Sequence, residues 1–322
     1  WPEPIGWLRW LARGLRSRPE IAAAVHDRRW ALQTAGRLGL ALPGSAVVTD
    51  VDHLAAHLRH VQAALAISEG AWVVKAPWTT SGRDRFVALG ADAIDPQRVA
   101  RVRNLFVRHR VLVFEPWLDR LDDAAAVGLV LGGKLAPRML GVHRQYCDSK
   151  GRFAAVEFAG VEDVHHAGLP GYESLPLVAR RVGEELARAG YRGPFGVDAF
   201  RYRDRCSGEV RLHALCEVNA RLTFGLLGRA LRARWHHAGL LDPRSQALAL
   251  HLASPAASSA SAAAPGVSGA SSAGQTLPAA STPAAAPGTS TVALAWAGEA
   301  ATGPLAWATM RPLHGAIDAA PA

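Results

Sequence analysis

The sequence predicts an α+β protein with two α/β lobes, each an antiparallel sheet backed by helices. Three observations point to this class. Segments with apolar residues at helical spacing alternate with short apolar runs typical of strands. Turn signals, such as Gly132-Gly133 and the polar segment 204–208, join neighbouring runs as hairpins. The chain of 322 residues is long enough to bury a substantial core.

Each predicted helix carries apolar residues on one face. In the first, Asp27 stands as the N-cap, and Trp30, Thr34 and Leu38 recur every four residues before Gly39. Helices are predicted over residues 27–39, 51–65, 96–108 and 177–189. Strands are predicted over residues 72–75, 86–89, 111–115, 124–131, 134–141, 196–202, 211–218 and 292–296.

The apolar run 215–221 contains the most informative polar residues of the chain. Glu217 and Asn219 are two positions apart, so on a strand both side chains emerge from the same face. Asp198 is available from a neighbouring strand. Such a set of hard oxygen donors suits Mg²⁺. The alternative is that Glu217 and Asn219 lie on the solvent face of an antiparallel strand.

Two further segments supply what a magnesium-nucleotide site needs. Lys75 lies in an otherwise apolar strand and is followed by the polar loop 79–85. A buried ammonium requires a partner, and phosphate is a natural one. The strand 111–115 ends in Glu115, and Pro116 then stops its hydrogen-bond ladder, which leaves backbone groups that could recognise an adenine edge.

In this order, the segments resemble the ATP-grasp superfamily, the fold of D-alanine–D-alanine ligase, biotin carboxylase and glutathione synthetase. The resemblance covers about residues 27–221 and implies an ATP-grasp fold whose two lobes close on a nucleotide. Members usually carry a preceding α/β domain. Residues 1–26 are therefore expected to be a remnant of a truncated N-terminal domain, or a linker.

The resemblance also implies which residues hold the nucleotide. The expected contacts come from the lysine strand, its loop, the hinge and the strand beyond, namely Lys75, Ser81, Gly82, Glu115, Trp117, Leu118 and Asp122. Asp122 stands in the ribose-binding place, and Asp123 takes that place if the register slips by one.

The implied metal ligands are Asp198, Glu217 and Asn219, which would hold Mg²⁺, with Mn²⁺ as an alternative. Arg221 follows as in Glu-x-Asn-x-Arg and would face the transferred phosphate, so Arg221 and Lys75 are the expected catalytic residues. Arg28 stands where many relatives have lysine.

The activity that the resemblance implies is ATP-dependent carboxylate–amine ligation. A small-molecule carboxylate would be activated as an acylphosphate and coupled to an amine or another nucleophile. Two alternatives remain open: an ATP-grasp kinase of small molecules and a non-catalytic ATP-binding module.

The composition limits the partners. The net charge is +9, yet the arginines are scattered and no nucleic-acid motif accompanies them, so small anionic substrates are expected rather than nucleic acid. No apolar stretch is long enough to span a membrane. The three cysteines lack disulfide or metal spacing, which favours free thiols in the cytoplasm. The protein is also expected to form a homodimer.

The domain organisation follows the motifs. Residues 27–110 are predicted to form the N-terminal lobe, and residues 111–252 the C-terminal lobe with the metal site. The segment 253–291 is rich in alanine, serine and proline and has too few large apolar side chains to offset ordering, so disorder is expected there. Residues 292–322 are expected to be a strand and tail.

Overall fold

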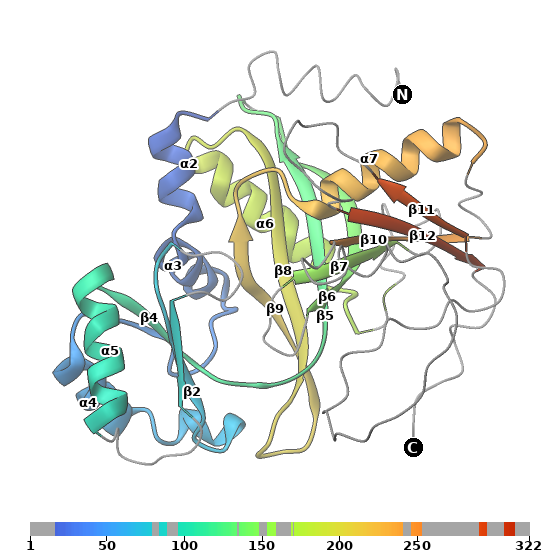
Figure 1. The fold of residues 1–322 in the computed structure, drawn as a ribbon. Helices are drawn as coiled ribbons and strands as arrows, with labels where there is room; N and C mark the ends of the chain where they lie inside the picture. Colours follow the sequence, from blue (N-terminus) through green and yellow to red (C-terminus); the bar gives the residue numbers. More distant parts are fainter. Residues whose placement is uncertain are drawn as a thin grey trace, which may run out of the picture.

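The protein is described by a computed structural model that covers residues 17–78, 84–88, 96–133, 135–147, 153–158, 169, 171–240, 246–252, 290–294 and 306–312. The predicted α+β class is confirmed, because helices pack on two antiparallel sheets (Figure 1). The segment predicted to be disordered lies outside the described residues, except that its last two residues belong to a strand.

The smaller sheet has the order β1-β4-β2-β3, and its neighbouring strands are antiparallel. Its strands are β1 (Ala46–Val48), β2 (Trp72–Lys75), β3 (Arg85–Ala88) and β4 (Leu112–Pro116). The helical elements beside it are α4 (Val51–His60), η1 (Ala64–Ser68) and α5 (Pro96–His109). The buried rings of Trp72, Phe86 and Phe114 lie at the centre of its core.

The larger sheet has the order β11-β12-β10-β7-β6-β5-β8-β9. Its strands are β5 (Asp119–Val130), β6 (Arg138–Cys147), β7 (Phe153–Phe158), β8 (Gly193–Arg203), β9 (Val210–Asn219), β10 (Gln246–Leu252), β11 (Ser290–Leu294) and β12 (Ala306–Pro312). The helices packed on it are α2 (Pro19–His26), α3 (Arg28–Leu38), α6 (Leu175–Arg188) and α7 (Phe224–His237).

The predicted lobe boundary requires a correction. The sequence placed the strand after residue 110 in the C-terminal lobe, but β4 pairs with β1 and β2 in the smaller sheet. Conversely, α3 was assigned to the N-terminal lobe but packs against the core of the larger sheet. Pairing between distant segments decides sheet membership, and chain order alone does not specify that pairing.

The first predicted helix is confirmed in detail. Asp27 is its N-cap and accepts a hydrogen bond from the backbone N–H of Arg29 at 2.8 Å. Gly39 ends the helix with a φ of 70°, a left-handed conformation that glycine adopts without strain. The predicted helix 51–65 is instead split into α4 and η1.

Alternation along β8 separates the two faces of the larger sheet. Phe195 and Val197 point into the core that contains α6, whereas Gly196 and Asp198 line a cavity on the other face. Helix α7 contributes its first turn to this cavity. The cavity face of the larger sheet therefore lies between α7 and the smaller sheet.

Several elements were not predicted, among them β1, β7, α7, β10 and β12. Helix α7 contains Gly225 and Gly228, which weaken a helical pattern in a sequence. The structure needs both glycines, because a Cβ would lie 2.1 Å from the His143 ring at Gly225 and 2.4 Å from the Phe158 ring at Gly228. Close packing of α7 against the sheet thus explains why this helix contains the two glycines that made it hard to predict.

Candidate functional site

A cavity of about 640 Å³ lies where the two sheets face each other. Strands β2, β3 and β4 line it from the smaller sheet, and β5 to β9 line it from the larger one. Helices α3 and α7 add residues from their first turns. This volume is in the range of small-molecule sites, and walls from two sheets are typical of such sites.

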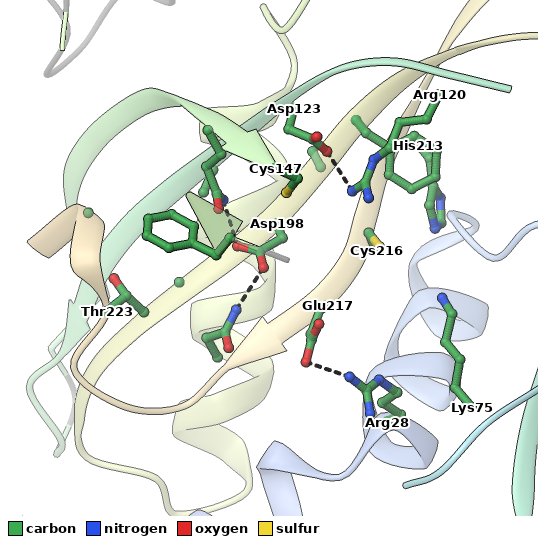
Figure 2. Close-up of a pocket in the computed structure, with 18 of the residues that line it drawn as sticks. Arg28, Lys75, Arg120, Asp123, Cys147, Asp198, His213, Cys216, Glu217 and Thr223 are labelled. Carbon is green, nitrogen blue, oxygen red and sulfur yellow. Dashed lines mark hydrogen bonds and ion pairs between the residues drawn. The ribbon is translucent and has the colours of Figure 1, made fainter. Parts of the chain in front are cut away.

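The three predicted metal ligands lie together in this cavity (Figure 2). Asp198 of β8 and Glu217 of β9 are directly paired residues of neighbouring strands, and Asn219 follows two positions later. The Asn219 amide donates to Asp198 Oδ2 at 2.9 Å, and the Gln145 amide donates to Asp198 Oδ1 at 3.0 Å. Burial and the nearby charge of Glu217 raise the pKa of Asp198 to about 6.

These residues fit a hard divalent cation. Chiefly burial, and then the charge of Glu217, disfavour the ionised form of Asp198 and so raise its pKa, and a bound cation would favour that form. The described residues contain no group of three or more His, Cys, Asp or Glu that could hold a metal. A cation held by two carboxylates and one amide would need phosphate and water as further ligands, which is the usual situation for Mg²⁺.

Two arginines contact the predicted metal ligands. The Arg28 guanidinium donates to Glu217 Oε1 at 3.1 Å and to the carbonyl oxygen of Ala76 at 2.8 Å. Arg221 donates to Asn219 Oδ1 at 2.9 Å and lines the cavity. Arg28 therefore links the end of the lysine strand to a predicted metal ligand on the other sheet.

Lys75 lies in the cavity but has a protein partner. Its ammonium forms an ion pair with the Glu115 carboxylate of the adjacent strand. Lys75 is paired with Val113 in the register and Val73 with Glu115, so the two charged residues are diagonal neighbours. Burial alone would lower the pKa of Lys75. The charge and the hydrogen bond of Glu115 are the main effects that outweigh burial, so the pKa of Lys75 is raised.

The predicted adenine hinge borders the cavity. Glu115, Trp117 and Leu118 all line it. The backbone N–H of Trp117 is already engaged, because it donates to the carbonyl oxygen of Ala71 at 2.9 Å.

The two aspartates predicted for ribose binding lie on different faces of β5. Asp122 is absent from the cavity lining; it forms an ion pair with Arg201 and accepts a hydrogen bond from the Tyr172 hydroxyl at 2.6 Å. Asp123 lines the cavity and pairs with Arg120 at 2.5 Å. A register irregularity between Arg120 and Asp122 accompanies this difference. Of the two predicted positions, Asp123 is thus the one that lines the cavity.

The remaining predictions concern two loop residues and the three cysteines. Ser81 and Gly82 lie outside the described residues. The three cysteines are free thiols, as predicted.

Sequence reasoning missed several lining residues. His143, Gln145 and Cys147 of β6 are two positions apart and all line the cavity, so alternation along a correctly bounded strand would have found them. His213 also lines the cavity. It is 4% exposed, its Nε2 has no partner among the described residues, and burial lowers its pKa to about 4.

No helix in the described part of the chain is long and apolar enough to cross a membrane. No protein-family model matches the chain, and no curated protein matches it.

Solved structures show a likeness of fold. The carboxyaminoimidazole ribonucleotide synthase of Aspergillus clavatus, complexed with ATP, matches at a TM-score of 0.49 and 15% identity, over 89% of this chain and 68% of that one. The N5-carboxyaminoimidazole synthetase of Staphylococcus aureus, complexed with ADP, matches at 0.46 and 10%, over 71% and 57%. The biotin carboxylase of Campylobacter jejuni matches at 0.48 and 10%, over 70% and 50%.

The chain thus spans about half to two thirds of the length of these enzymes. The likeness is one of overall fold to these three enzymes.

Proposed function

We propose that this protein is an ATP-dependent ligase that activates a small-molecule carboxylate and couples it to an amine or another nucleophile. The observation that carries the proposal is the pairing of Asp198 with Glu217, beside Asn219, in a cavity that also contains Lys75 and Arg221. Two adjacent carboxylates with basic residues close by suit a cation that bridges to phosphate oxygens.

The proposed reaction has two balanced steps. An oxygen of the substrate carboxylate attacks the γ-phosphorus of ATP, the bond to the β,γ-bridging oxygen breaks, and ADP leaves with the electron pair. The nucleophile then attacks the acyl carbon of the acylphosphate, phosphate leaves, and an amine nucleophile releases a proton. Chemistry of this kind depends mainly on positioning and on charge stabilisation.

Different residues of the chain would position the reactants and stabilise the charge. Asp198, Glu217 and Asn219 would hold Mg²⁺ or Mn²⁺, which when bound would offset phosphate charge. Lys75 and Arg221 would stay protonated and donate charged hydrogen bonds to the phosphates. The hinge would position the base beside Leu118, and Asp123 would bind the ribose hydroxyls.

The Lys75–Glu115 pair favours a second candidate, a non-catalytic ATP-binding module. A lysine that is already neutralised by the protein has to exchange its partner before it can contact phosphate. A kinase that releases a phosphorylated small molecule is the other alternative that the reaction scheme leaves open.

The test offers the protein ATP, Mg²⁺ and pooled small carboxylates with pooled amines, and follows ADP and new amide masses. ADP with a new amide supports the ligase, and a stable phosphorylated product supports the kinase. ATP binding without ADP release supports the module. Asp198→Asn and Glu217→Gln should abolish turnover while the fold is kept, and the exposed Glu209→Gln is the matched control. Full turnover in both cavity variants would overturn the metal assignment.

Two further expectations belong to this proposal. The reaction would take place in the cytoplasm, and the chain would form a homodimer. Sedimentation of the purified protein, with and without nucleotide, tests the dimer directly.

A further inference from the structure

Arg28 joins the two sheets of the protein. Its guanidinium donates to Glu217 Oε1 of β9 at 3.1 Å and to the carbonyl oxygen of Ala76, directly after β2, at 2.8 Å. Its backbone N–H donates to the carbonyl oxygen of Pro77 at 3.0 Å. Figure 2 shows the ion pair with Glu217 as a dashed line. One residue thus holds both a predicted metal ligand of the larger sheet and the end of the lysine strand.

The larger sheet fixes the position of the Arg28 backbone. Arg28 opens α3, directly after the N-cap Asp27, which is 4% exposed. Ala31 and Ala35 of the same helix are buried in the core of the larger sheet. The contacts that Arg28 makes directly after β2 therefore tie this strand to a helix of the other sheet.

The end of β2 depends on the Arg28 guanidinium. Ala76 is fully buried, and its N–H donates to the carbonyl oxygen of Asp84, just before β3, at 3.0 Å. Its own carbonyl oxygen accepts from Arg28. If Arg28 left, this buried carbonyl would lose that hydrogen bond, which is costly unless the backbone moves to find another donor. Displacement of Arg28 is therefore coupled to movement of the end of β2.

The same guanidinium opposes a cation at Glu217. The side chains of Arg28 and Glu217 are 13% and 29% exposed, so water screens their ion pair less than a surface pair. A cation bound to Glu217 Oε1 at about 2 Å would compete with the guanidinium for that oxygen, and the two positive charges would repel each other. The hydrogen bonds that Asp198 accepts come from neutral amides instead. Arg28 is therefore the group that a cation has to displace.

We infer that Arg28 is an autoinhibitory latch: it withholds Glu217 from a divalent cation, and it releases the end of β2 when a cation displaces it. The inference rests on the proposed function, because that proposal places the cation on Glu217. Coupling of this kind is reciprocal, so a movement that draws β2 away from Arg28 would also strengthen cation binding. One side chain would thus control both cation binding and the position of the lysine strand.

Mn²⁺ binding to the full chain, measured by electron paramagnetic resonance, tests the first half of the inference. Arg28→Gln removes the charge but keeps a donor for Ala76, so it should bind Mn²⁺ about three- to tenfold more tightly than the unchanged protein. Arg28→Lys keeps the charge and should bind Mn²⁺ more weakly than Arg28→Gln. Arg37→Gln is the matched control, because Arg37 belongs to the same helix and pairs with Glu185, and neither residue lines the cavity. It should leave the Mn²⁺ affinity unchanged.

Hydrogen exchange, followed by mass spectrometry, tests the second half. Saturating Mn²⁺ should speed exchange in peptides that contain Arg28 or residues 72–77 by at least about threefold, because the end of β2 is released. Glu217→Gln should do the same without metal, since it removes the charge that holds Arg28. The control Glu209→Gln, whose carboxylate is well exposed, should leave this exchange unchanged.

Two results would overturn the latch. One is equal Mn²⁺ affinity in Arg28→Gln and Arg37→Gln, and the other is exchange at the end of β2 that neither Mn²⁺ nor Glu217→Gln changes. Both expected results in a protein that forms no ADP would contradict the ligase and leave the latch standing. Formation of ADP and a new amide, together with an Mn²⁺ affinity that Arg28→Gln does not change, would do the reverse.

Discussion

Replacing Glu115 by Gln should lower the free energy of unfolding by roughly 3 kcal/mol. The change leaves the Lys75 ammonium in a site where its side chain is only 20% exposed, and the lost carboxylate was 14% exposed. Removing one partner of a buried ion pair costs about 3–5 kcal/mol, and the residual exposure places this pair at the lower end. Urea unfolding, followed by tryptophan fluorescence, measures the change.

A double-mutant cycle separates the pair from its surroundings. Lys75→Met removes the charge that Glu115→Gln exposes, so the double variant should be clearly more stable than the sum of the two single losses predicts. The control is Glu209→Gln, whose partner Arg211 and whose own carboxylate are well exposed, and which should leave stability unchanged. The reasoning is refuted if Glu115→Gln unfolds at the same urea concentration as this control.

Three further predictions concern the cavity. Asp198→Asn and Glu217→Gln should each weaken Mn²⁺ binding, measured by electron paramagnetic resonance, by at least about tenfold, since each removes a carboxylate ligand. Unchanged binding in both would contradict the metal site.

Stability should also fall on acidification from pH 7.5 to 5. Burial lowers the pKa values of His143 and His213 to about 3 and about 4, below the usual value of 6.5. The unfolded chain therefore binds more protons in this range, and each histidine costs about 2 kcal/mol at pH 5. Urea unfolding at both pH values should show a smaller loss once the two are replaced by glutamine. Finally, Asp123→Asn should weaken nucleotide binding in calorimetry by several-fold, and an unchanged affinity would remove its ribose role.

That Asp198, Glu217 and Asn219 lie together could be predicted, because their proximity depends on local pattern. Glu217 and Asn219 share a face through simple alternation, and the polar turn 204–208 joins their strand to the one that carries Asp198. Which of Asp122 and Asp123 lines the cavity could not be fixed in this way. Alternation from Glu115 onward is interrupted by the irregularity in β5, which exchanges the faces of Asp122 and Asp123.

The partner of Lys75 shows a different limit. Its ion pair depends on the register between β2 and β4, which are separated along the chain by β3 and α5. The sequence correctly indicates that a lysine in an apolar strand needs an anion, but it does not distinguish a protein carboxylate from a ligand phosphate. Only the three-dimensional pairing makes that distinction.

Under the proposed function, an anion would bind in the cavity by displacing protein partners of these basic groups. Lys75 contacts Glu115, Arg28 contacts Glu217, and Arg221 contacts the Asn219 amide before any ligand arrives. When a phosphate binds one of these basic groups, the protein oxygen that the group contacted before loses its partner. That oxygen then needs another partner. For Glu217 a divalent cation meets that need, so metal and nucleotide should bind more tightly together than separately.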